Sequence, residues 1–101
     1  MTGRWRGTRS ELGWSVTADM TLTEDPGGSI AGTGHLDIVP LGGADGTVTG
    51  RHQHPEVLLV AEAPGFLSAD FDGTFKGDDL VDGTVQSPFV GTISFTLHRA
   101  S

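Results

Sequence analysis

Residues 66–99 read FLSADFDGTFKGDDLVDGTVQSPFVGTISFTLHR, and this stretch decides the fold. Apolar and polar residues alternate along it in three runs, which two very short segments separate. Such alternation is typical of β-strands that have one buried face and one wet face. Each run carries a Gly-Thr step, at 73–74, 83–84 and 91–92. The stretch therefore predicts three consecutive antiparallel strands joined by tight turns.

The rest of the chain repeats this pattern. Its cleanest run is 14–23, in which the apolar members are Trp14, Val16, Ala18, Met20 and Leu22. Further alternating runs at 4–9, 30–38, 47–54 and 56–63 predict four more strands. Turn residues separate them, such as Pro26-Gly27-Gly28. The glycine-rich segment 42–46 is expected to be the longest connection.

Strands in simple succession with short connections are typical of an up-and-down meander. The chain has 16 glycines, and glycine inside a helix costs about 1 kcal/mol at each position, so helices are disfavoured. An open sheet would expose two edges, which closure removes. We predict an all-β fold, a closed antiparallel up-and-down barrel of about eight strands, forming one domain over residues 1–101.

Composition excludes several functions. Cysteine is absent, which rules out disulfides and thiolate chemistry. The net charge of −7 argues against nucleic acid as a partner, because phosphate binding needs clustered Lys and Arg. No apolar run approaches the roughly 20 residues that cross a bilayer, so no membrane partner is expected. As written, the chain is expected in the cytoplasm, with a trimmed secreted form as the alternative, and the sequence does not decide between them.

Both ends of the chain carry a short motif. Gly3-Arg4-Trp5 lies on the first expected strand, and Arg99 lies at the end of the last. This pattern resembles the calycin superfamily of lipocalins, fatty-acid-binding proteins and avidins, whose barrels begin with Gly-x-Trp and end with an Arg that packs on that Trp. The resemblance implies that Trp5 and Arg99 seal one end of the barrel. The chain has no Tyr, so the Arg–Tyr clamp and the aromatic cage of those families are absent.

The expected interior is aliphatic and aromatic, interrupted by glycines that could leave a cavity. The leading functional hypothesis is non-catalytic binding of a small, largely apolar molecule, with no cofactor. The expected ligand-binding residues are Trp14, Met20, Leu36, His52, His54, Phe71, Phe75 and Phe95. One alternative is a structural or oligomerisation scaffold with a filled barrel. The other is a barrel-interior cyclase or isomerase that uses His52 or His54 for proton transfer.

Two further features carry predictions. His52-Gln53-His54 has the spacing of metal ligands on a strand, but no third ligand is evident, so we predict no metal site. Leu58 and Val60 are apolar at positions whose alternation points them outward. They predict either a subunit contact or an inverted assignment of the inward face, and an isologous homodimer through this strand is the preferred interpretation.

Overall fold

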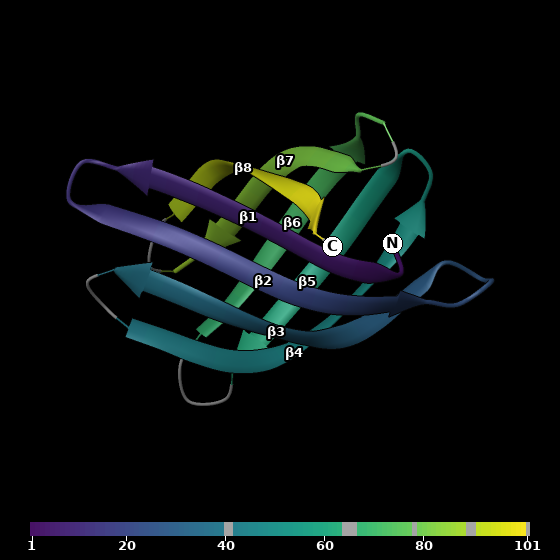
Figure 1. The fold of residues 1–101 in the computed structure, drawn as a ribbon, viewed down its shortest axis with the longest axis horizontal. Coiled ribbons are helices and arrows are strands. Elements are labelled where there is room, and N and C mark those ends of the chain that lie inside the picture. The colour runs from purple at the N-terminus through teal and green to yellow at the C-terminus, as the bar shows by residue number, and fades with distance from the viewer. Residues whose placement is uncertain (40–41, 64–66, 78, 89–90, 101) are drawn as a thin grey trace.

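The structure is a computed structural model that describes residues 1–39, 42–63, 67–77, 79–88 and 91–100. Its strands are β1 (Gly3–Glu11), β2 (Trp14–Glu24), β3 (Ser29–Val39), β4 (Gly42–Gln53), β5 (Glu56–Ala63), β6 (Leu67–Phe75), β7 (Leu80–Ser87) and β8 (Gly91–Ala100). Each pairs with its neighbours in sequence, and β1 also pairs with β8, so the sheet closes on itself (Figure 1). The predicted fold class is therefore confirmed. Within the described ranges, no helix is long and apolar enough to cross a membrane.

The barrel has two ends, which differ in their residues. At one end lie the start of β1, the end of β2, the end of β6 and the start of β7; we call it the Trp5 end. At the other lie the β1–β2 hairpin, the end of β5 and the start of β8; we call it the cavity end. Between β1 and β8 the paired residues are Arg4–Arg6 and His98–Ala100, at the Trp5 end. Among the described residues this is the shortest of the strand pairings, so the seam of the barrel is held mainly at that end.

The core follows the alternation read from the sequence. Its buried apolar side chains are Met1, Trp5, Val16, Met20, Leu22, Ile30, Ile38, Val48, Val57, Leu59, Phe71, Val81, Phe95 and Leu97. Trp5 and Val57 are fully buried. Phe66 and Phe89, together with the Leu67 side chain, lie outside the described residues. In β5 the predicted inward positions Val57 and Leu59 are buried, while Leu58 is 53% exposed.

Inward-facing glycines mark points where backbones approach closely. A Cβ added at Gly32 would lie 2.0 Å from the backbone oxygen of Thr21 on the neighbouring strand. At Gly50 the same atom would lie 2.0 Å from the backbone oxygen of Leu58. No side chain can occupy such positions without moving the backbone. Glycine thus permits the strong coiling that closes so small a barrel.

The expected connection at 42–46 is wrong. β4 begins at Gly42, and its first residues pair with Gly34–Ile38 of β3. Glycine content suggested a loop there, but Gly46 has another role: a Cβ at this residue would lie 2.2 Å from the backbone oxygen of Glu62. β4 also ends at Gln53, which leaves His54 in the turn to β5.

Candidate ligand-binding cavity

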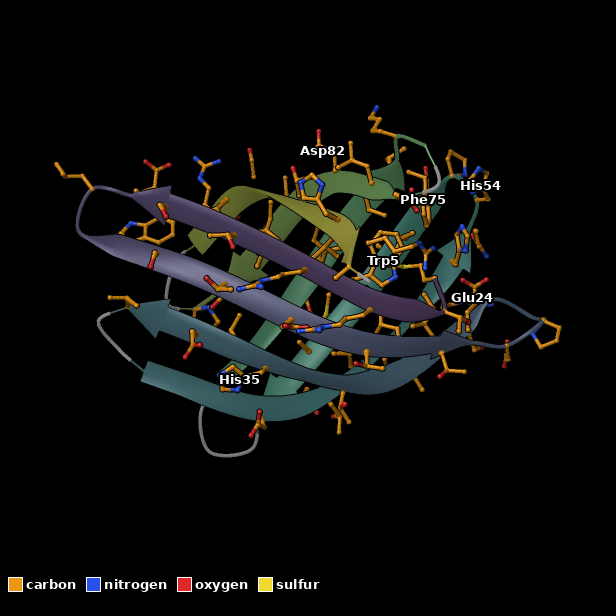
Figure 2. The ribbon with its side chains drawn as sticks, in the orientation of Figure 1. Trp5, Glu24, His35, His54, Phe75 and Asp82 are labelled. Carbon is orange, nitrogen blue, oxygen red and sulfur yellow. The ribbon has the colours of Figure 1, made fainter. Side chains whose placement is uncertain are left out.

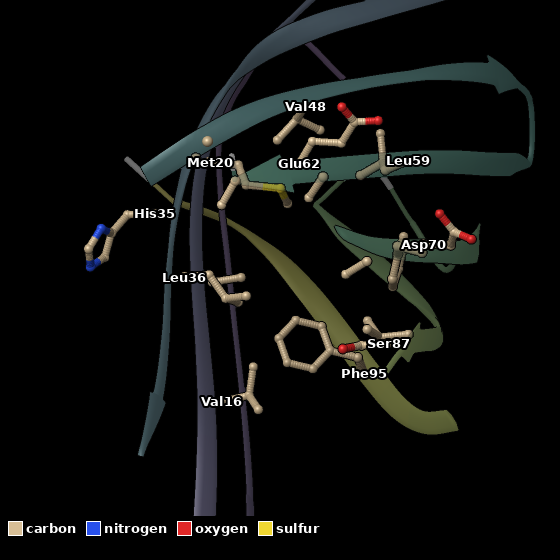
Figure 3. Close-up of a pocket in the computed structure, with 18 of the residues that line it drawn as sticks. Val16, Met20, His35, Leu36, Val48, Leu59, Glu62, Asp70, Ser87 and Phe95 are labelled. Atoms are coloured by element: carbon tan, nitrogen blue, oxygen red, sulfur yellow. The ribbon is translucent and has the colours of Figure 1, made fainter. Parts of the chain in front are cut away.

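A cavity of about 90 Å³ lies inside the barrel, toward the cavity end. Its wall comes from β2–β8, and Figure 3 shows aliphatic and aromatic side chains around it. The apolar side chains in the wall are Val16, Ala18, Met20, Leu36, Ile38, Ala44, Val48, Leu59, Ala61, Ala63, Ala69, Phe71, Val85, Ile93, Phe95 and Leu97. An apolar wall excludes ordered water unless polar partners are present, so this space suits an apolar occupant.

The cavity lies where several of the inward residues are small. Ala18, Ala44, Ala61 and Ala69 occupy inward positions on β2, β4, β5 and β6, and the wall also includes Gly34 and Gly46. At the Trp5 end the inward positions carry larger side chains, among them Trp5, Leu22, Ile30 and Phe75. The volume of the interior residues therefore changes along the barrel axis, and the unfilled space falls where alanine and glycine gather.

Polar residues border the cavity. Thr47, Glu62 and Asp70 contribute to its lining but are exposed, whereas Ser87 is a buried polar residue at the end of β7. Glu62 and Asp70 alternate with the inward-facing Ala61 and Ala69, and Figure 3 shows their carboxylates pointing away from the cavity. The lining that remains is almost wholly apolar, which favours neutral molecules over ions.

His35 also borders the cavity, yet Figure 3 shows its ring pointing away from it. The ring nitrogens lie 2.7 Å from Asp45 Oδ1 and 3.2 Å from Asp37 Oδ2. The hydrogen bond to Asp45, together with the negative charges of both carboxylates, raises the pKa of His35 above its usual value of 6.5, against a smaller opposing effect of burial. His35 therefore belongs to a surface ion cluster on β3 and β4, outside the cavity.

At the Trp5 end, the fully buried Trp5 anchors the barrel closure. Its indole N–H donates to the Met1 carbonyl at 2.8 Å. The Arg99 guanidinium carbon lies 4.5 Å from the centre of the indole, and Arg99 Nη1 donates to the Thr2 carbonyl at 2.7 Å. Arg99 also pairs with Asp79, 3.1 Å away. The cation–π contact and these hydrogen bonds join the first strand to the last at the seam.

An aromatic and ionic cluster adjoins Trp5, and Figure 2 shows Trp5, Glu24, His54 and Phe75 gathered at this end. Phe75 packs edge-on against Trp5, with ring centres 5.9 Å apart, and stacks at a tilt on His52, 4.9 Å away. His52 Nδ1 lies 2.8 Å from Glu24 Oε1. Burial alone would raise the pKa of Glu24, but hydrogen bonds from the Met1 amino group and His52 outweigh burial and hold it below its usual value.

The structure divides the expected ligand-binding residues into two groups and leaves Trp14 outside both. Met20, Leu36, Phe71 and Phe95 line the cavity. His52, His54 and Phe75 do not; they lie together at the Trp5 end. Trp14 starts β2 at the cavity end and packs on the core, but it is not among the lining residues. Alternation along a strand tells which face a residue occupies but not its height in the barrel, so it could not separate these groups.

The alanines of the wall were missed as site residues. The expected ligand-binding residues all have large side chains, and Ala44 falls in the expected connection at 42–46. The usable signal is the run of small residues at inward positions of neighbouring strands.

Leu58 and Val60, the expected interface residues, lie on β5. Leu58 pairs with Arg51 on one side and Asp72 on the other, so charged neighbours flank it.

The fold and site together define a closed eight-strand antiparallel barrel with a small apolar cavity near one end. No protein-family model and no curated protein matches the sequence. Among solved structures, the chain is similar to a de novo designed fluorescence-activating β-barrel, with a TM-score of 0.75, 16% identity, and 99% of this chain and 94% of that chain covered. It is also similar to the redesigned β-barrel mFAP1 bound to DFHBI, with a TM-score of 0.74, 12% identity, and 98% and 94% covered. These similarities show the fold; membership of the calycin superfamily stays a prediction.

Proposed function

We propose that this chain binds a small, largely apolar molecule non-covalently inside its barrel, without a chemical step. The observation that carries the proposal is the apolar cavity of about 90 Å³. Two similar barrels support it, since one is named for activating fluorescence and the other is bound to DFHBI. Their low identity leaves the ligand of this chain to be argued from its own cavity.

The cavity size and border limit the ligand. About 90 Å³ is less than the roughly 150 Å³ apolar cavity that holds benzene in an engineered protein. A ligand with one or two rings would therefore fill the cavity and extend toward its border. A charged group would lose its hydration against this apolar lining, so we expect a flat, neutral molecule to bind more tightly than an anion of the same shape.

The two alternatives have less support. A scaffold with a filled barrel would need no cavity, and this barrel has one. A barrel-interior enzyme that uses His52 or His54 would need these imidazoles beside the bound substrate. Both lie at the Trp5 end and outside the cavity lining. The geometry thus favours binding over either alternative.

Titration with two fluorogenic dyes, Nile red and DFHBI, tests the proposal. Ala61→Leu and Ala18→Leu each add three carbons to the cavity, and Ala31→Leu adds the same carbons on the exposed face of β3. We expect at least tenfold weaker dye binding in both filling variants and wild-type binding in the Ala31 control. Cavity filling commonly stabilises proteins by about 0.5–2 kcal/mol, so urea unfolding will separate lost binding from lost folding.

Two results would contradict the proposal. One is that neither dye gains fluorescence with the wild-type protein up to the solubility limit of the dye. The other is that both filling variants, folded by urea unfolding, bind as tightly as the wild type. In the second case the dye binds elsewhere on the barrel surface.

A further inference from the structure

A second cluster, at the Trp5 end, brings two imidazoles together. His52 Nε2 and His54 Nδ1 lie 3.2 Å apart. Two nitrogen ligands, each about 2.0–2.1 Å from one metal ion, are roughly 2.9 Å apart at a right angle and roughly 3.3–3.4 Å apart at the tetrahedral angle. The observed separation falls between these values. The two imidazoles therefore already lie at the spacing of a bidentate site.

Glu24 prepares His52 for this role. The carboxylate accepts a hydrogen bond from His52 Nδ1 at 2.8 Å, which fixes the proton on that nitrogen and leaves the lone pair on Nε2. Nε2 is the nitrogen that faces His54. A carboxylate behind a ligating histidine orients the ring and raises its basicity, an arrangement common in metal sites. The sequence spacing alone did not reveal this partner, because Glu24 lies on a different strand.

Packing restricts both rings further. Phe75 stacks on His52 and on His54, with ring centres 4.9 Å and 5.5 Å away. The His52 side chain is 15% exposed, whereas His54 is exposed. One ligand is thus held by its neighbours, and the other is open to solvent and to an incoming ion.

We propose that His52 and His54 form a bidentate site for one divalent first-row transition metal ion, with Glu24 positioning His52. Among the described residues, no group of three or more His, Cys, Asp or Glu side chains is placed to hold a metal, so water completes the coordination. Such a partly open nitrogen site prefers Cu²⁺ to Ni²⁺ or Zn²⁺. His54 binds through Nδ1, and a proton on that nitrogen moves through solvent to its own Nε2. The site lies apart from the cavity and does not depend on the proposed ligand binding.

The test is titration of the full chain with Cu²⁺, followed by calorimetry and by pulsed electron paramagnetic resonance, which detects coordinated imidazole. We expect one ion per chain with two imidazole ligands. His54→Ala, at an exposed position, should lower the affinity at least tenfold and leave one imidazole. Glu24→Gln should lower it about tenfold while keeping two imidazoles, since loss of such a partner costs about 10–100-fold. The matched control, His35→Ala with His98→Ala, should bind as the wild type does.

The proposal is wrong if His54→Ala binds Cu²⁺ as tightly as the wild type, or if the double control loses the site. It is equally wrong if the wild-type protein takes up no Cu²⁺ at a one-to-one ratio at about 100 μM. Circular dichroism of each variant shows whether it is folded. His54 lies in a turn and is exposed, so its variant reports on the site even if Glu24→Gln is destabilised.

Discussion

Gly32→Ala tests whether the glycines are present for close backbone approach. The added Cβ would lie 2.0 Å from the Thr21 oxygen and 3.0 Å from both the Thr21 carbonyl carbon and the Leu22 Cα. All three atoms belong to the backbone of β2, so no side-chain rotation relieves the overlap. Real Cβ contacts are essentially never shorter than 3.0 Å, and the two strands must therefore separate by about 1 Å at this point.

The size of the effect follows from this overlap. Overpacking by a methyl group typically costs about 1–3 kcal/mol, and a purely backbone clash belongs in the upper part of that range. A loss of about 2–3 kcal/mol would lower the Tm of a domain of this size by roughly 8–24 °C. Urea unfolding followed by tryptophan fluorescence gives the free energy of unfolding and the m-value together.

Gly27→Ala is the matched control. Gly27 lies in the turn between β2 and β3, where an added Cβ would approach only Asp25 Oδ1, at 3.4 Å. This substitution should change the free energy of unfolding by less than about 0.5 kcal/mol, because alanine also restricts the unfolded chain. If Gly32→Ala unfolds within about 0.5 kcal/mol of the wild type at the same m-value, glycine is not required there and the explanation of barrel closure fails.

Three other substitutions test separate features. Arg99→Met keeps apolar contact with Trp5 but loses the cation–π interaction and the hydrogen bonds. The free energy of unfolding, measured in urea, should therefore fall by about 1–2 kcal/mol. An unchanged urea midpoint would show that Arg99 does not stabilise the seam. His35→Gln should be less stable than the wild type below pH 6.5, because protonated His35 favours the folded state through its contact with Asp45. The difference in stability should disappear as the pH rises through the raised pKa of folded His35. Urea midpoints that differ equally at pH values well below and well above that range would refute this. Leu58→Asp should convert the expected homodimer to monomer in sedimentation experiments, and a wild-type protein that is only monomeric at high micromolar concentration removes the dimer.

The sequence predicted which side of the barrel wall a residue occupies much better than its height along the axis. Phe71 and Phe75 illustrate the difference. Both were expected inward on the same strand, yet Phe71 lines the cavity and Phe75 stacks on His52 at the Trp5 end. The period of two along a strand sets the face. Height depends on the stagger between strands, which comes from pairings between residues far apart in the chain, and no local pattern carries it.

Glu24 shows the same limit in the candidate metal site. His52 and His54 were visible together because they are two residues apart. Their carboxylate partner precedes His52 by 28 residues, and the intervening chain makes a complete passage along β3 and back along β4. Only the barrel register brings the end of β2 beside the end of β4. The short spacing in the sequence revealed His52 and His54, and the fold was needed to show that Glu24 orients His52.

The cavity connects stability with function in this barrel. At about 24 cal/mol for each Å³ left unfilled, a cavity of about 90 Å³ costs roughly 2 kcal/mol of folding free energy. The alanines that create it could be replaced by larger apolar residues, as at the Trp5 end, where the core is filled. A barrel that served only as a scaffold would gain stability from such replacements and lose nothing. A binding barrel would lose its ligand, and a ligand present at about 100 times its Kd would contribute about 2.7 kcal/mol, enough to offset the cost of the cavity. The proposed binding role would account for the unfilled space, and on that proposal the stability gained by Ala61→Leu should come with a loss of dye binding.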